Sequence, residues 1–206
     1  MTTTRTAATL TRTATLAALV LLLGACVGST PPSRHYVLTP LEAAPEGAAM
    51  DTELVFAVGP VSLPAYLDRP QIVLATGPNE RRFAELARWA EPLDAGMNRT
   101  LRENLSRLLG SEHVTTWPGV QTEMPTVRVA VQVLRFDVST ADGQADLQAR
   151  WTLFDADGNA TLVRRSEVRS RLSGDSEAAW IDALSSAVAE LSKQIALEVH
   201  AQAMGG

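Results

Sequence analysis

The only cysteine of the chain, Cys26, ends a short apolar run and precedes a polar segment with two prolines. The run over residues 14–23 carries no charge and follows Arg5 and Arg12, which is the pattern of an export signal. At about ten residues it has half of the roughly 20 residues that a membrane-spanning helix needs. We therefore expect the folded domain to begin after this segment, and with one cysteine it must fold without a disulfide.

The four residues that end at the cysteine, Leu23-Gly24-Ala25-Cys26, resemble the bacterial lipobox, in which the cysteine becomes the lipidated first residue of the mature protein. A lone cysteine is more often a buried, inert residue, but its position after an export signal favours lipidation here. Each buried methylene contributes about 0.8 kcal/mol, so the two or three acyl chains of a bacterial lipoprotein would anchor the protein permanently. Cys26 is thus expected to be an anchor and not a nucleophile.

Val27 stands directly after the predicted lipidation site. The resemblance to lipoproteins of bacteria with two membranes implies release to the outer membrane, because Asp at this place is the usual signal for retention in the inner one. We expect a signal peptide over residues 1–25, an acylated N-terminus and flexible tether over 26–34, and one domain over 35–206. The predicted location is the periplasmic face of the outer membrane, with attachment through the acyl chains.

The charge balance argues against a nucleic-acid-binding protein. The chain has 23 acidic and 18 basic residues, a formal net charge of -5. Loss of Arg5 and Arg12 with the signal peptide makes this about -7. Acidic and basic residues are interspersed along the sequence, and no basic stripe is evident.

Five segments predict short strands in the first part of the domain. Residues 35–39, 54–61 and 113–117 are rich in β-forming residues, and Gly59-Pro60 should end or bulge the second of them. Residues 71–76 and 82–89 are expected to form a hairpin around Gly77-Pro78-Asn79. The second arm, with Phe83, Leu86 and Trp89, fits a helical period about as well as a strand.

Two amphipathic helices are predicted. The first is expected to have Pro92 as its first helical residue and Gly110 as its C-terminal cap. Its apolar face comprises Leu93, Met97, Leu101, Leu105 and Leu108. The second is expected to be capped by Gly174-Asp175-Ser176 and to continue to His200. Its apolar face comprises Trp180, Leu184, Val188, Leu191, Ile195 and Val199.

Between the helices, residues 127–172 predict a three-stranded antiparallel meander. Apolar residues alternate from Val127, and the phase slips by one residue at Leu134, which indicates a β-bulge. Asp142-Gly143 and Asp157-Gly158 are hairpin turn signals. The predicted fold is therefore a single layered α/β domain with a mixed β-sheet of six to eight strands, this meander, and two main amphipathic helices packed on the sheet.

Motifs for enzymatic chemistry are absent from the sequence. It contains no nucleophile-elbow, P-loop or dinucleotide-binding pattern. His35, His113 and His200 are not at ligand spacing, and residues 155–159 lack the glycine position and the glutamate of a calcium loop. We expect no catalytic residue, no metal and no cofactor.

Two segments are more specific than their surroundings, YLDRPQIV at residues 66–73 and RWAEPL at 88–93. Together with the lipobox, the early HYVL segment and the NLSRLLG end of the first helix, they resemble the ABC-type transport auxiliary lipoproteins, the PqiC-like family. The resemblance covers nearly the whole mature chain and weakens toward its C-terminal half. It implies a non-enzymatic periplasmic subunit of an envelope lipid or organic-solvent-resistance transport system.

The same resemblance implies the partners. They are a periplasmic MCE-family protein and, where present, the permease and ATPase of an ABC transporter, which the lipoprotein would dock at the outer membrane. PqiC-like proteins can form rings, which implies that this chain can associate with itself. Two other functions stay open, a carrier that binds lipid in an apolar cavity and a purely structural envelope lipoprotein that binds peptidoglycan.

Five residues of the specific segments are candidates for an interface with a partner or a second copy: Tyr66, Asp68, Arg69, Gln71 and Trp89. Tyrosine and arginine are enriched at binding hot spots. The alternative is a structural turn, in which Arg69 is extended before Pro70 and pairs with Glu91, and Asp68 accepts local backbone hydrogen bonds. A tryptophan beside a helix start, such as Trp89, is more often a core residue.

Overall fold

The computed structural model describes residues 31–43, 55–119 and 124–205. The chain from Ser33 to Gly206 forms one compact unit. Cys26, the predicted signal peptide and most of the predicted tether lie outside the described residues.

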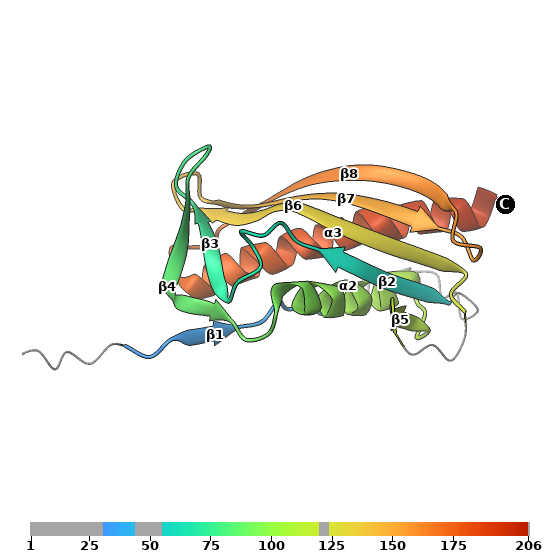
Figure 1. Ribbon diagram of the computed structural model, residues 1–206, viewed down its shortest axis with the longest axis horizontal. Helices are drawn as coiled ribbons and strands as arrows, with labels where there is room; N and C mark the ends of the chain where they lie inside the picture. Colours follow the sequence, from blue (N-terminus) through green and yellow to red (C-terminus); the bar gives the residue numbers. More distant parts are fainter. Residues whose placement is uncertain (1–30, 44–54, 120–123, 206) are drawn as a thin grey trace, which may run out of the picture. The chain divides into compact units, whose positions relative to one another are not determined.

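Within the described residues, eight strands form one mixed sheet and two helices pack on it (Figure 1). The strands are β1 (Arg34–Tyr36), β2 (Phe56–Ser62), β3 (Gln71–Ala75), β4 (Arg81–Trp89), β5 (Val114–Thr116), β6 (Val127–Ser139), β7 (Gln144–Phe154) and β8 (Ala160–Arg171). The helices are α2 (Leu93–Leu109) and α3 (Glu177–Gly205). The single layered α/β domain expected from the sequence is confirmed.

The long strand β6 organises the sheet. One of its edges pairs with β7 over the whole length, while the other pairs with β2 along its first half and with β3 at Val138. β5 extends the sheet beyond β2, and β4 and β1 extend it beyond β3. A single strand thus aligns two separate groups of strands that the chain forms one after the other.

The predicted meander is confirmed as the antiparallel strands β6, β7 and β8. Gly143 and Gly158 have φ values of 63° and 85° in the two connecting turns, the left-handed region that glycine enters without steric cost. The register shifts between Val133 and Arg135, where the alternation of the sequence slips. The bulge therefore keeps apolar residues on the inner face along all of β6.

The second arm of the β3–β4 hairpin is a strand, which settles the ambiguity between helix and strand at residues 82–89. It pairs antiparallel with β3 and parallel with β1. Its side chains Ala84, Ala87 and Trp89 are buried. The register with β3 shifts between Gln71 and Val73, and this irregularity explains why the alternation was weak in the sequence.

Both helices follow their predicted apolar faces. The α2 residues predicted to face the core are all buried, and Gly110 adopts the left-handed conformation at its C-terminus. Pro92 is the residue before the first helical one and not the first itself, a shift of one position. In α3 the predicted face is buried except for the half-buried Trp180, and Ser176 Oγ accepts a hydrogen bond from Ala179 N at 3.2 Å.

The segment after β1 is clamped between the two helices. Leu38 is 2% exposed, and its carbonyl accepts a hydrogen bond from Arg99 Nη2 at 3.0 Å. Thr39 N donates to Ser185 Oγ of α3 at 3.1 Å, and Leu41 N donates to Asn104 Oδ1 of α2 at 2.7 Å. The chain that leads from the tether is therefore built into the core.

Candidate functional site

The YLDRP segment forms the connection between β2 and β3. β2 pairs with β6 as far as Gln132 and β3 rejoins β6 at Val138, so residues 63–70 leave the sheet where the chain could have continued as a strand. Tyr66 Oη lies 3.5 Å from the carbonyl oxygen of Leu134, at the limit of hydrogen bonding. The connection lies beside the bulge of β6.

Backbone hydrogen bonds and one buried side chain hold this turn. Leu67 N donates to Pro64 O at 2.9 Å and Arg69 N donates to Leu67 O at 2.8 Å. The Leu67 side chain is 1% exposed and packs in the core. Asp68 is exposed, and no hydrogen bond to its carboxylate occurs within the described residues. The turn therefore does not depend on Asp68 as a local acceptor.

Tyr66 lies half-buried next to charged groups of the sheet. Burial is the main cause that raises the pKa of its phenol above the usual value of about 10, and the negative charge of Asp137 adds to this effect. Arg81 and Arg135 act in the opposite direction. The phenol thus stays neutral and keeps its proton as a hydrogen-bond donor.

Arg69 stacks on Phe83 of β4, with its guanidinium carbon 3.9 Å from the ring centroid. The expected pair between Arg69 and Glu91 is wrong. Glu91 Oε1 instead accepts hydrogen bonds from Arg99 of α2, at 2.8 Å from Nη2 and 3.2 Å from Nε. Arg99 reaches back over the first turns of its helix, so the carboxylate is already occupied.

The ring of Trp89 packs in the core, and its backbone N–H stabilises the YLDRP turn. Its side chain is 6% exposed and stacks with Phe136 at a centroid distance of 6.3 Å. Its backbone N–H donates to Pro70 O at 2.6 Å. Gln71 is half-buried and stands opposite Arg88 in the β3–β4 ladder.

The fold brings the two specific segments together around one pocket of about 360 Å³. Its walls are Asp68, Arg69, Pro70, Trp89, Ala90, Glu91, Pro92 and Leu93. Of the five predicted interface residues, Asp68, Arg69 and Trp89 line this pocket, whereas Tyr66 and Gln71 do not. Whether these residues contact a partner stays a prediction.

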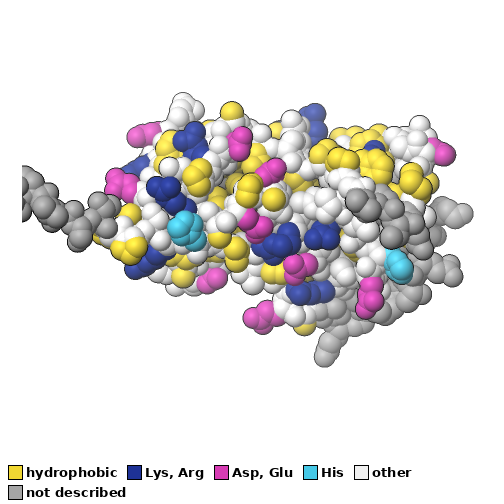
Figure 2. Space-filling view, turned by 60° about the horizontal axis from the view of Figure 1, so that its bottom comes forward, with side chains coloured by type: hydrophobic (Ala, Val, Ile, Leu, Met, Phe, Trp, Pro, Cys, Tyr) yellow, Lys and Arg dark blue, Asp and Glu magenta, His cyan; other side chains and the backbone are white. Residues whose placement is uncertain are grey.

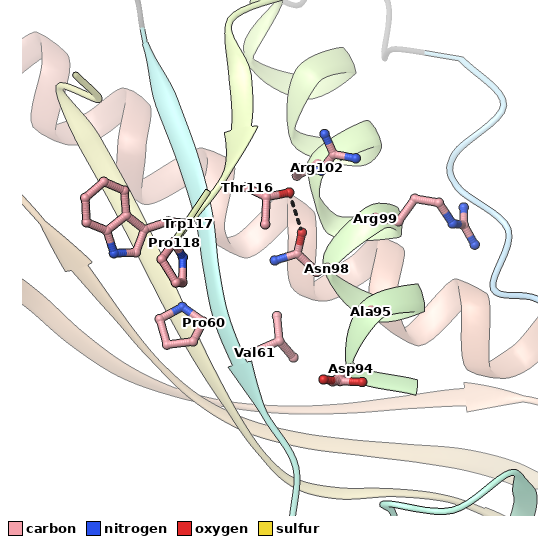
Figure 3. Close-up of a pocket in the computed structure, with 10 residues that line it drawn as sticks. All are labelled: Pro60, Val61, Asp94, Ala95, Asn98, Arg99, Arg102, Thr116, Trp117 and Pro118. Atoms are coloured by element: carbon pink, nitrogen blue, oxygen red, sulfur yellow. Dashed lines mark hydrogen bonds between the residues drawn. The ribbon is translucent and has the colours of Figure 1, made fainter. Parts of the chain in front are cut away.

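A second pocket, of about 370 Å³, lies on the flank of α2 and was not predicted from the sequence (Figure 3). It is lined by Pro60, Val61, Asp94, Ala95, Asn98, Arg99, Arg102, Thr116, Trp117 and Pro118. Asn98 Nδ2 donates to Val58 O at 3.0 Å and Thr116 Oγ1 donates to Asn98 Oδ1 at 3.1 Å. Gly59-Pro60 lies at an irregularity inside β2, where the register with β6 shifts between Val58 and Val61, and Trp117-Pro118 follows the end of β5. These two prolines are the sequence signal that could have indicated the pocket.

Both of these pockets are lined by polar and apolar side chains. In the part of the chain that the structure describes, no group of three or more His, Cys, Asp or Glu side chains could hold a metal ion. Across the same residues, neither helix is long and apolar enough to cross a membrane.

Comparison with known proteins identifies the family. The model of the "ABC-type transport auxiliary lipoprotein component" family matches residues 36–196. No curated protein matches the chain.

Solved structures show the same fold at low identity. An uncharacterized protein is 22% identical, with a TM-score of 0.68, and the match covers 82% of this chain and 99% of that one. Protein XCC0632 from Xanthomonas campestris is 17% identical, with a TM-score of 0.66 and coverage of 80% and 93%. PelC from Paraburkholderia phytofirmans, a dodecamer, is 10% identical over 73% and 91%, but its TM-score of 0.40 is too low to carry an argument. On its match over residues 36–196, the chain belongs to the family of ABC-type transport auxiliary lipoprotein components.

Proposed function

We propose that this chain is a non-enzymatic, lipid-anchored periplasmic subunit of an ABC/MCE-type envelope transport system for lipids or for resistance to organic solvents. It docks the transport assembly at the outer membrane, where the acyl chains on Cys26 hold it. Its partners are a periplasmic MCE-family protein and, through it, the permease and ATPase of the transporter. The observation that carries the proposal is the family match over residues 36–196.

The position of the lipobox agrees with this role. Only six residues lie between Cys26 and Ser33, where the compact unit begins, so the span from Cys26 to Ser33 is seven residue steps. An extended chain spans at most about 3.5 Å per residue, so the tether can hold the domain no further than about 25 Å from the membrane. A subunit held this close can join a membrane to an assembly that reaches it from the periplasm.

The contact surface that we propose for the partner is the pocket formed by the YLDRP turn and the start of α2. The pocket offers an exposed carboxylate at Asp68 and a guanidinium at Arg69, which stacking on Phe83 holds in one orientation. A preoriented arginine loses less conformational entropy on binding. The same pocket could receive a neighbouring copy of the chain, since the family resemblance implies rings.

A lipid carrier is the second candidate, and the two pockets beside α2 do not favour it. A carrier needs an enclosed apolar cavity that buries most of its ligand. The pockets beside α2 instead include Asp68, Arg69 and Glu91 in one case and Asp94, Arg99 and Arg102 in the other. Charged walls suit contact with a protein better than storage of an acyl chain.

Site-specific crosslinking in cells would test the docking role. A photo-crosslinking residue at Asp68 should capture the MCE protein, and the same residue at Asp157, an exposed position in the β7–β8 turn, should not. Capture from both positions, or from neither, would count against the proposed surface.

The anchor is tested separately. Cys26→Ser should prevent incorporation of labelled palmitate and release the protein from the membrane fraction into the periplasm. A Cys26→Ser protein that still fractionated with membranes would contradict the lipid anchor, whatever the crosslinking shows.

A further inference from the structure

One face of the meander is not covered by either helix. α3 packs against β6, β7 and β8 on the inner face, and α2 packs beside α3 (Figure 1). Alternate residues of the three strands point to the other side, which we name the outer sheet face. Its cross-strand rows are Arg128–Phe154, Ala130–Thr152–Val163, Gln132–Arg150–Arg165, Arg135–Gln148–Glu167, Asp137–Asp146–Arg169 and Ser139–Gln144–Arg171.

The outer sheet face is basic although the chain is acidic. Its rows hold six arginines and three acidic residues, whereas the whole chain has 18 basic and 23 acidic residues. The fold therefore separates charges that are interspersed in the sequence. Figure 2 looks at the molecule from the lower side of Figure 1, and there basic and acidic side chains are intermingled.

Two of the three acidic residues on this face, Asp137 and Asp146, are buried and paired with arginines. The side chains of Asp137 and Asp146 are 0% and 7% exposed. Arg135 bridges both, at 2.8 Å and 3.2 Å, and Arg169 Nε lies 3.4 Å from Asp146 Oδ1. Arg81 of the β3–β4 hairpin adds a third cation, 2.7 Å from Asp137. An approaching ligand therefore meets the arginines and not these carboxylates.

Three further arginines point to solvent with little to balance them. Arg150, Arg165 and Arg171 are exposed. Arg165 contacts Glu167 at 3.3 Å, while the guanidinium groups of Arg150 and Arg171 make no hydrogen bond or ion pair within the described residues. Arg150 stands directly opposite Arg165 in the ladder, and like charges in that position destabilise a sheet. Such an arrangement suits a surface that is completed by an external anion.

One end of the basic face lies near the place where the described chain enters the domain. β8 ends at Arg171 and leads into α3. Glu177, the first residue of α3, accepts a hydrogen bond from Tyr36 Oη of β1 at 2.8 Å. β1 starts at Arg34, the last residue of the predicted tether, and Arg34 Nη1 lies 3.5 Å from Glu177 Oε2. The described chain therefore enters the domain at the start of α3, six residues after Arg171.

We propose that the outer sheet face binds anionic phospholipid head groups of the membrane that carries the anchor. Guanidinium groups form paired hydrogen bonds with phosphate, and a negative membrane surface attracts basic residues held near it. The remainder of the chain is acidic, so this face alone is attracted and the domain takes one orientation. The proposal rests on the anchor of the proposed function for the choice of membrane, but binding itself needs no acyl chain.

Vesicle sedimentation of the acyl-free chain from Val27 to Gly206, which contains the whole compact unit, tests the proposal. The protein should sediment with vesicles of phosphatidylglycerol and phosphatidylcholine and not with phosphatidylcholine alone. Each basic residue near an anionic surface contributes about a fivefold gain in partition. Arg150→Gln with Arg171→Gln should therefore lower binding about 25-fold, and salt near 1 M, where the screening length is about 3 Å, should abolish it.

The matched control changes the net charge by the same amount on the helices. Arg107 and Lys193 lie on α2 and α3, each paired with a glutamate of its own helix. Arg107→Gln with Lys193→Gln should retain most of the binding. Equal losses in the two double variants, or equal binding to neutral vesicles, would overturn the proposal. The proposal would also be overturned if the chain bound neither kind of vesicle but bound immobilised polyglutamate through Arg150 and Arg171. The ligand of this face would then be an acidic protein.

Discussion

At the scale of single residues, Asp137 is a fully buried carboxylate that pairs with arginines from two parts of the sheet. It is fully buried on β6, yet it faces Arg135 of the same strand and Arg81 of another hairpin. The Arg81 Nε lies at ion-pair distance without the alignment of a hydrogen bond. A buried carboxylate persists only when cations compensate its lost hydration. Asp137 therefore joins the β3–β4 hairpin to the meander.

Replacing Asp137 should be costly because it removes the carboxylate that pairs with the partly buried Arg81 and one of the two that pair with Arg135. Asp137→Ala should lower the free energy of unfolding by about 3 kcal/mol or more, measured by urea denaturation. Glu85→Ala, at an exposed position of β4, should change it by less than about 0.5 kcal/mol. Similar effects of the two substitutions would show that the buried carboxylate does not hold the hairpin.

The two tyrosines provide a second test at this scale. Burial raises the pKa of both Tyr36 and Tyr66 above the usual value of about 10. A raised pKa in the folded state means that the neutral phenols stabilise the fold fully below pH ~10, and that this contribution is lost as the pH rises from there through the folded-state values.

Alkaline titration followed by phenolate absorbance should therefore show both tyrosines ionising above pH ~10 in the folded protein. In denaturant both should ionise near their usual pKa. Because the chain has two tyrosines, Tyr66→Phe leaves Tyr36 as the sole signal and assigns each transition. A Tyr66 that ionised in the folded protein as readily as in denaturant would contradict its burial beside Asp137.

At the scale of secondary structure, the sequence predicted the features that are determined by residues close together in the chain. The apolar face of α2, the left-handed cap at Gly110, the meander and its bulge beside Leu134 all follow from period, turn chemistry and phase. These signals lie within one or two turns of chain, so a single sequence contains them.

Contacts between distant segments were not predictable in this way. No pattern indicates that β2 and β3 share one edge of β6, or that Glu91 pairs with Arg99 instead of Arg69. The pairing of β6 with two groups of strands is a choice among several topologies of similar local propensity. The flank pocket of α2 depends on that topology and was missed. The basic outer sheet face was missed as well, although the alternation of the predicted meander places its arginines on one side.

Gly59 tests one of these long-range contacts. Its φ is 128°, and a Cβ atom there would collide with the backbone carbonyl oxygen of Trp117 after β5. Gly59→Ala should therefore lower the free energy of unfolding by about 2 kcal/mol or more, because neither backbone can yield freely. Gly77→Ala is the control, since its nearest contact would be 3.8 Å away, and it should be close to neutral. A neutral Gly59→Ala would contradict the close approach of β2 to the end of β5.

At the scale of the whole molecule, the segment that follows the predicted tether is part of the folded core and not a flexible extension of it. β1 pairs with β4, Tyr36 bonds to the start of α3, and the next residues bond to both helices. In the proposed docking role, any force between the membrane and a docked partner would therefore pass through the core. A subunit that positions an assembly against a membrane requires such a rigid connection.

Substitutions at two adjacent residues, Val37 and Leu38, test whether this segment is part of the core or a passive linker. Leu38 is 2% exposed and Val37 is 49% exposed. Leu38→Ala should lower the free energy of unfolding by about 3 kcal/mol through the cavity it leaves, while Val37→Ala should cost well under about 1 kcal/mol. Native-state proteolysis should also cut the segment around residue 38 faster in Leu38→Ala than in Val37→Ala, because local opening of the clamp becomes less costly. If both variants were as stable and as resistant as the parent chain, the segment would be a passive linker, and the anchor could not fix the orientation of the domain.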